Sequence, residues 1–169
     1  MENFFKKFGP VCIFVAAMLW ASDAPFRLHL TKDLSSELIV FGEHFFAILI
    51  ALPILFYNWA DVKKLSWQGW VSVLIVAICG SALASIAFAR CVPQREDGEV
   101  FSPNTIGVLL ALTAALFWGA STVLGKYALR TISFQTMTAL RFTLAFLFLF
   151  GMNAYRGTLG GIGLISGTD

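Results

Sequence analysis

The stretch IGVLLALTAALFWGASTVLG, residues 106–125, decides the fold class, because its 20 residues include no charged side chain. A helix of about 20 apolar residues is long enough to cross the hydrocarbon core of a bilayer. A second stretch of the same length, WVSVLIVAICGSALASIAFA at residues 70–89, is also free of charge. The two stretches predict two membrane-spanning helices.

Three further apolar runs, residues 11–26, 38–57 and 132–152, each contain one or two ionisable residues. The composition agrees with a membrane protein, since 58% of the residues are hydrophobic and 13% are charged, against about a quarter charged in soluble domains. The sequence therefore predicts an all-α integral membrane protein of about five transmembrane helices, with no soluble catalytic domain.

An internal repeat relates the two ends of the chain. With Trp118 placed over Trp20 and Arg141 over His44, FWGAST aligns with LWASDA, and ISFQTMTALRF aligns with SSELIVFGEHF. We infer that helices one and two were duplicated as helices four and five. Residues 1–100 then form a first-repeat portion of three helices, and residues 101–169 form the start of a second repeat, with two helices and a glycine-rich tail.

The repeat bears on two other features of the chain. Residues 11–26 follow Lys6 and Lys7 and resemble a cleavable secretory signal, but a segment that is copied inside the mature chain argues against cleavage. Because three crossings separate the copies, the copies run in opposite directions, as in the inverted repeats of secondary transporters. The positive charges of Lys6 and Lys7 before the first helix, and of Lys63 and Lys64 in the second loop, predict a cytoplasmic N-terminus. With five spans, the C-terminus is then external.

The second copy, AALFWGASTVLGKYALRTISFQTMTALRFTLAFLFLF at residues 114–150, resembles the opening two helices of a repeat in the drug/metabolite transporter superfamily, EamA-like branch. The resemblance rests on the motif Trp118-Gly119-Ala120-Ser121, followed by a serine-led turn and by Arg141-Phe142. The first copy fits less closely. The resemblance implies a transporter that moves small metabolites across the cell membrane, cytoplasmic or plasma, and it places Trp20 and Trp118 on inward-facing helices.

The chain departs from the family pattern of ten helices in two inverted halves. No stretch after residues 70–89 corresponds to the fourth and fifth helices of the family pattern. Residues 153–169 form no convincing span. We therefore expect an incomplete inverted-repeat bundle, either a fragment or internal deletion, or a short form that associates as a homo-oligomer or with complementary helices.

Charged residues within the apolar runs are candidates for a substrate or ion pathway. A charge near the bilayer centre costs roughly 2.5 to 3.5 kcal/mol, so such groups face the bundle interior and find partners. Together with the two tryptophans, the candidates are Trp20, Asp23, Glu43, His44, Trp118 and Arg141.

Each charged candidate has a functional and a structural interpretation. Glu43 or Asp23 can exchange a proton or cation, and Arg141 can bind substrate. Alternatively, Glu43 forms a fixed ion pair with Arg141, or Arg141 extends to the cytoplasmic interface. Asp23 can also lie at the outer interface. His44 is favoured as a hydrogen-bonded packing residue, and because adjacent residues lie about 100° apart on a helix, only Glu43 or His44 is expected to face the cavity.

Small residues predict close helix packing. Ala111, Ala115 and Gly119 recur every four residues in the stretch 106–125, and Gly80 and Ala84 have the same spacing in 70–89, as in small-xxx-small interfaces. We expect these faces to pack against other helices, and the Gly80 to Ala84 face to have lost its partner.

Other function classes find little support in the sequence. It has no HExxH, GxSxG or P-loop motif, and Cys12, Cys79 and Cys91 show no CxxC spacing. We therefore expect no enzyme activity, no metal and no cofactor. The net charge of +2 gives no nucleic-acid footprint. A non-transporting membrane assembly or accessory subunit is the alternative to a transporter, ahead of an intramembrane enzyme.

Overall fold

The structure is a computed structural model that describes residues 2–31, 34–91 and 105–158, and within these ranges it is helical with no strand. The helices, in chain order, are α1 (Glu2–Ala21), α2 (Asp23–Leu30), α3 (Ser36–Tyr57), α4 (Trp59–Val62), α5 (Trp67–Ile75), the π-helix η1 (Val76–Leu83), α6 (Ala84–Cys91), α7 (Thr105–Ala128) and α8 (Phe134–Arg156).

Four helical segments are long and apolar enough to cross a membrane: Ser36–Tyr57, Trp67–Cys91, Thr105–Ala128 and Phe134–Arg156. A fifth apolar stretch, Phe8–Leu19 in α1, is shorter. The prediction of an all-α membrane protein of about five helices is confirmed. The third span is a continuous run of α5, η1 and α6, longer than the predicted residues 70–89.

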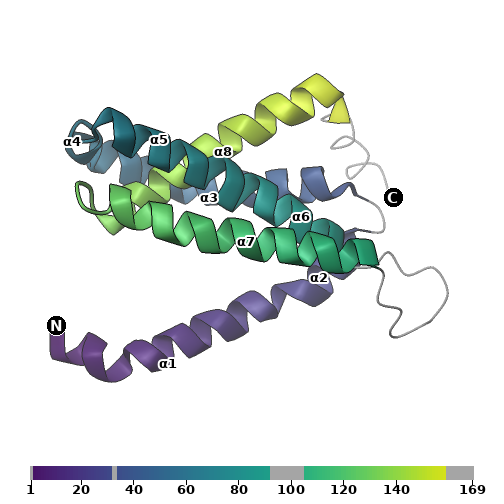
Figure 1. Ribbon diagram of the computed structural model, residues 1–169, viewed down its shortest axis with the longest axis horizontal. Helices are drawn as coiled ribbons and strands as arrows, with labels where there is room; N and C mark the ends of the chain where they lie inside the picture. The colour runs from purple at the N-terminus through teal and green to yellow at the C-terminus, as the bar shows by residue number, and fades with distance from the viewer. Residues whose placement is uncertain (1, 32–33, 92–104, 159–169) are drawn as a thin grey trace.

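The first predicted helix, residues 11–26, is broken at Ser22, between α1 and α2. Pro25 has no N–H to donate to the carbonyl of Ala21, so the helical ladder is interrupted at this point. The Ser22 hydroxyl donates to the carbonyl of Leu19 at 2.7 Å, a local bond that competes with regular helix. In Figure 1, α1 lies apart from the other long helices, and α2 continues from its end toward them.

The core of the bundle is formed by α3, α8, η1 and α7, with α3 packed along α8 and η1 packed against both α7 and α8. Phe41 of α3 stacks on Phe146 of α8 with their ring centroids 5.3 Å apart. Leu149, Val40 and Val73 are fully buried within this packing. Close side-chain contact of this kind holds helices together in lipid, where the hydrophobic effect between helices is small.

The helix directions are those that an inverted repeat requires. In Figure 1, α1 and α7 run in opposite directions, and so do α3 and α8. The start of α1 lies at the same end of the bundle as α4, whereas α8 finishes at the opposite end.

The helix caps correct the register of the repeat by one residue. Ser35 caps α3 by accepting from the backbone N–H of Leu38, and Ser133 caps α8 by accepting from that of Thr136. A serine side chain at this position satisfies a backbone donor that the helix leaves free. Ser133 follows Ser35 by the same interval as Trp118 follows Trp20, so Arg141 is equivalent to Glu43. An alignment on the caps therefore places Arg141 over Glu43, one residue from the His44 that the sequence alignment had placed there.

The two small-residue faces differ from the prediction in which of them is buried against another helix. Gly80 and Ala84 are buried, and a Cβ added to Gly80 would overlap the side chain of Ser121 on α7. This face therefore keeps a partner within the chain. Ala111, Ala115 and Gly119 are instead exposed, because α7 turns its other side, with Ala114 and Ser121, toward the bundle.

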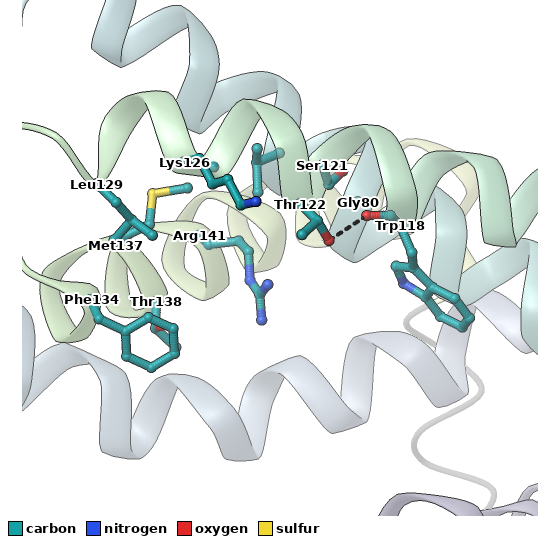
Figure 2. Close-up of a pocket in the computed structure, with 12 residues that line it drawn as sticks. Gly80, Trp118, Ser121, Thr122, Lys126, Leu129, Phe134, Met137, Thr138 and Arg141 are labelled. Atoms are coloured by element: carbon teal, nitrogen blue, oxygen red, sulfur yellow. Dashed lines mark hydrogen bonds between the residues drawn. The ribbon is translucent and has the colours of Figure 1, made fainter. Parts of the chain in front are cut away.

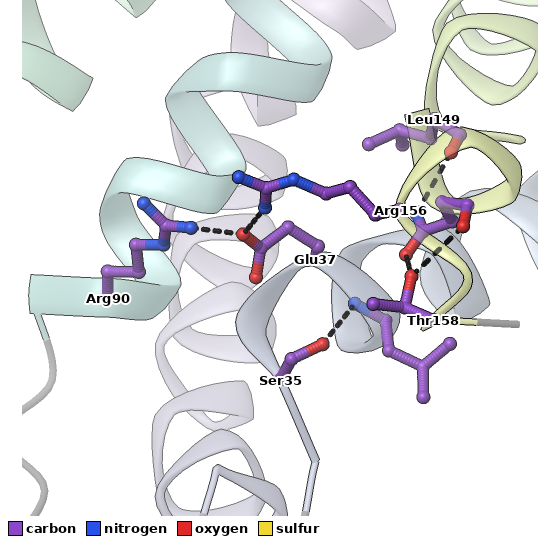
Figure 3. Close-up of polar contacts among 8 residues, drawn as sticks. Ser35, Glu37, Arg90, Leu149, Arg156 and Thr158 are labelled. Atoms are coloured by element: carbon purple, nitrogen blue, oxygen red, sulfur yellow. Dashed lines mark hydrogen bonds and ion pairs between the residues drawn. The ribbon is translucent and has the colours of Figure 1, made fainter. Parts of the chain in front are cut away.

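A carboxylate ties the helices together at the end of the bundle where α3 begins. Glu37 accepts from Arg90 of α6 and, at 2.6 Å, from Arg156 of α8 (Figure 3). Its side chain is 8% exposed, whereas the two arginines are about half exposed. The three residues, which we call the Glu37 clasp, join three membrane-spanning helices.

A second carboxylate joins helices at the opposite end. Asp61 accepts from the ammonium of Lys64 at 2.6 Å, and its other oxygen lies 3.4 Å from the backbone N–H of Ser133 and 3.3 Å from the hydroxyl of Thr136. The hydrogen bonds from Lys64 and Ser133 lower the pKa of Asp61 from 3.8 to about 2. Asp61 is therefore ionised at neutral pH and links the α4–α5 connection to the start of α8.

Candidate functional site

Two open cavities lie between the helices and share the residues Gly80, Trp118 and Arg141. Four residues that line the larger cavity are exposed: Thr122, Lys126, Leu129 and Phe134. The larger cavity has a volume of about 600 Å³ and lies mainly between α7, α8 and η1. The smaller cavity, of about 240 Å³, adds residues of α2 and α3. The larger volume is within the range of small-molecule sites in proteins, about 300 to 1,000 Å³.

The π-helix η1 forms part of the wall of both cavities. Val76 and Gly80 line the larger cavity, and Gly80 and Ser81 line the smaller one. A π-helix has a wider turn than an α-helix, and short π segments are frequent at functional sites. The sequence did not predict η1, because no proline marks it; its only signal is the run of small residues from Cys79 to Ala82.

The larger cavity combines cations with an apolar wall. Lys126 of α7 and Arg141 of α8 supply the charge, the hydroxyls come from Ser121, Thr122 and Thr138, and the apolar wall from Val76, Leu129, Phe134 and Met137. Figure 2 shows the guanidinium of Arg141 extending from α8 into this cavity. No acidic residue lines the larger cavity within the described chain.

The smaller cavity is built around a partly buried ion pair. Arg27 of α2 places Nη2 at 2.8 Å from each carboxylate oxygen of Glu43 on α3. Arg27 Nε also donates to Asp23, one turn earlier, so two acids share one guanidinium. Asp23 itself lines neither cavity within the described structure.

The predicted ion pair between Glu43 and Arg141 does not form, because Arg27 occupies the carboxylate of Glu43. Both Glu43 and Arg141 nevertheless line the smaller cavity. Arg27 was not among the residues predicted from the sequence, because it lies just after the apolar run of residues 11–26. The available signal was the spacing of four residues from Asp23, which places the two side chains on one face of a helix.

His44 is both a packing residue and a wall of the smaller cavity. Its Nδ1 lies 2.8 Å from the carbonyl oxygen of Val40, and since a carbonyl only accepts, Nδ1 carries the hydrogen. In the neutral ring Nε2 is then an acceptor. Its ring meets the edge of Phe142 at 5.6 Å. Glu43 and His44 both line the cavity, so the expectation that only one of them does was wrong.

Arg141 has no carboxylate partner among the residues that the structure describes. Its guanidinium carbon lies 4.8 Å from the ring centroid of Phe142, and its Nε is buried without a hydrogen-bond partner. A cation–π contact of this kind is worth about 0.5 to 2 kcal/mol, less than a buried charge costs.

Unpartnered polar atoms converge on the smaller cavity. Within the described chain, the buried side-chain nitrogens that lack a partner are Arg27 Nη1, His44 Nε2 and Arg141 Nε. All three residues line the smaller cavity. Because an unsatisfied buried polar group costs about 1 to 3 kcal/mol, this arrangement favours a site that polar ligand atoms or water complete.

The two candidate tryptophans differ in what can be said of them. Trp118 lines both cavities, and its ring centroid lies 5.4 Å from that of Phe88. The side chain of Trp20 falls outside the part of the structure that is described. Among the described residues, no group of three His, Cys, Asp or Glu side chains is placed to hold a metal.

Part of the chain that forms these cavities matches a known protein family. Residues 105–165 match the EamA-like transporter family. The match covers α7 and α8, the predicted second copy, and confirms the resemblance drawn from the Trp118 and Arg141 motifs. No curated protein and no solved structure matches the chain. The EamA-like segment contributes Trp118, Lys126 and Arg141 to the cavities.

Proposed function

We propose that the chain is a membrane transporter of the drug/metabolite type that moves small metabolites across the cell membrane. The observation that carries the proposal is the pair of adjoining cavities, with charged side chains, inside a bundle of membrane-spanning helices. The EamA-like match at residues 105–165 supports the same function.

Placing charged side chains in these cavities costs free energy, and this cost supports a functional role for them. Ionisable groups within membrane spans are rare, and they commonly mark substrate and ion pathways. Arg27 and Glu43 are paired with each other, but Arg141 has no such compensation among the described residues. A structural role alone would favour an apolar side chain at position 141.

We further propose that Glu43 couples transport to protons. Protonation of Glu43 would end its charge pairing with Arg27 and change the charge of the smaller cavity by one unit. The charged and titratable groups around it are Asp23 and Arg27 of α2, His44 of α3 and Arg141 of α8. Arg27 would keep Asp23 as its remaining acidic partner.

Solute flux through proteoliposomes tests the transport function. Thr122 lines the larger cavity, so Thr122→Trp would fill it. Thr113→Trp is a matched control, because both threonines are exposed residues of α7 that donate to the carbonyl four residues earlier. With a panel of radiolabelled organic acids, amino acids and nucleosides, we expect flux of at least one solute in the wild type and in Thr113→Trp, and its loss in Thr122→Trp. Flux no faster than in protein-free liposomes for every solute would contradict the proposal.

The second candidate function is a non-transporting membrane assembly or accessory subunit. The observation that favours it is the exposed small-residue face of α7, with Ala111, Ala115 and Gly119, since such faces permit close helix approach. A transporter can also associate through this face, so flux separates the two functions and cross-linking tests association. In a chain without native cysteines, Ala115→Cys should form a disulfide dimer in bilayers, whereas the exposed Leu147→Cys on α8 should not. Equal cross-linking at both positions would argue against association through α7.

A further inference from the structure

We infer that the transported molecule is a small organic anion with an apolar body, and that its anionic group binds to Arg141 in the larger cavity. The inference rests on the proposed transport function and names its substrate class. The charge balance of the two cavities, the hydrogen-bonding capacity of Arg141 and the apolar wall support it independently.

The larger cavity has an excess of positive charge. Its described lining contains Lys126 and Arg141 and no acid, and neither cation forms an ion pair with a carboxylate of the described chain. In the smaller cavity, by contrast, Arg27 is paired with two acids. An anion is therefore the ligand that balances the charge of this site.

The alternative, a cationic ligand, meets no unpaired carboxylate in the described lining of the two cavities. Glu43 is the acid that lines the smaller cavity in the described structure. Nη2 of Arg27 is 2.8 Å from each of its oxygens. A ligand ammonium would have to displace Arg27 from Glu43, whereas a ligand carboxylate at Arg141 displaces nothing.

The chemistry of the lining specifies the rest of the ligand. A guanidinium presents a planar fork of donors that matches the two oxygens of a carboxylate. The hydroxyl of Thr138 lies on the neighbouring wall, whereas that of Thr122 already donates to the carbonyl of Trp118, and Leu129, Phe134 and Met137 supply the apolar part. Figure 2 shows Phe134 and Thr138 on the same side of the cavity as Arg141. These groups suit an aromatic or aliphatic carboxylate better than a sugar or an inorganic ion.

Binding of benzoate, with benzamide as its neutral counterpart of the same shape, tests the inference on the purified full chain in nanodiscs. We expect saturable binding of benzoate in equilibrium dialysis, at least tenfold tighter than that of benzamide. Arg141→Gln should weaken benzoate binding at least tenfold and leave benzamide unchanged. Arg130→Gln, which removes an exposed arginine outside both cavities, should bind benzoate as the wild type does.

Two further variants keep the test decisive if Arg141→Gln does not fold. Arg141→Lys keeps the charge but loses the planar fork, so benzoate binding should weaken by severalfold. Lys126→Gln should weaken it by a smaller factor. Equal affinity for benzoate and benzamide, benzoate affinity that none of these variants changes, or no benzoate binding at all would overturn the inference. If one of these results were obtained and Thr122→Trp still blocked the flux of neutral solutes, the transport proposal would stand without the anionic substrate.

Discussion

The contact between Gly80 of η1 and Ser121 of α7 is predicted to be the most sensitive packing contact of the bundle. A Cβ at position 80 would overlap both the Cβ and the hydroxyl of Ser121. The Cβ of Ser121 is fixed by the backbone of α7, so rotating the side chain cannot relieve the overlap, and Gly80→Ala must push the two helices apart.

The size of the effect follows from two opposing contributions. Overpacking a close contact typically costs about 1 to 3 kcal/mol, and alanine recovers up to about 1 kcal/mol over glycine in helix propensity. We therefore expect Gly80→Ala to destabilise the folded chain by about 1 to 2 kcal/mol, which is roughly a 5- to 30-fold fall in the ratio of folded to unfolded protein.

Reversible unfolding in mixed micelles with increasing SDS measures this quantity. Gly119→Ala is the matched control on α7, because nothing lies within 4 Å of a Cβ added there, and we expect it to be neutral or slightly stabilising. Adding Ser121→Gly to Gly80→Ala removes the overlapping atoms and should recover part of the loss. If Gly80→Ala is as stable as Gly119→Ala, the close approach of η1 and α7 is refuted.

Three other predictions concern single carboxylates. Asp61 has a folded-state pKa of about 2, below its ordinary 3.8, so its ionised form stabilises the fold above about pH 4 and this contribution disappears as the pH falls through 2. Asp61→Asn should therefore be less stable than the wild type at neutral pH. Urea unfolding in micelles should show this difference in stability vanish near pH 2, and a difference that stays constant with pH would count against the link. Glu37→Gln should destabilise the Glu37 clasp by about 1 to 2 kcal/mol, since hydrogen bonds to charged groups contribute about 1.5 to 3 kcal/mol and the two arginines are half exposed. We expect faster hydrogen exchange at the ends of α6 and α8. Unchanged exchange would show that the clasp does not hold these helix ends together. Glu43→Gln should remove the pH dependence of solute flux while expression and membrane insertion stay normal, and a full pH response in vesicles would make Glu43 a structural residue.

The spans could be predicted from the sequence because the physical requirement is simple. A helix in lipid must satisfy its own backbone and present apolar side chains over about 20 residues, and the charge-free stretches around Gly80 and Trp118 meet that requirement. Chain order and loop charge then suffice to predict the antiparallel order of the helices. The serine caps were also visible in the repeat, although matching residue types placed Ser133 over Ser36 rather than Ser35.

The site was only partly predictable, because side-chain partners depend on three-dimensional packing. Glu43, His44 and Arg141 were identified from their chemistry and Trp118 from the family resemblance, and the structure places all four around the smaller cavity. The partner of Glu43 was missed because nothing in the sequence predicts that α2 brings Arg27 next to α3. The π-helix was missed for a similar reason, since its single extra residue per turn leaves no distinct hydrophobic period.

The most direct test of the account is solute flux before and after chemical modification of one cavity residue. In a chain whose Cys12, Cys79 and Cys91 are replaced, Thr122→Cys would be reconstituted and then treated with a bulky thiol reagent, with Thr113→Cys treated in parallel. Each variant folds before the reagent is added, so a change in flux reports on the cavity and not on folding. We predict that modification stops flux in Thr122→Cys and leaves it unchanged in Thr113→Cys; continued flux after complete modification at position 122, or flux that is absent in the unmodified chain, would contradict transport through this cavity.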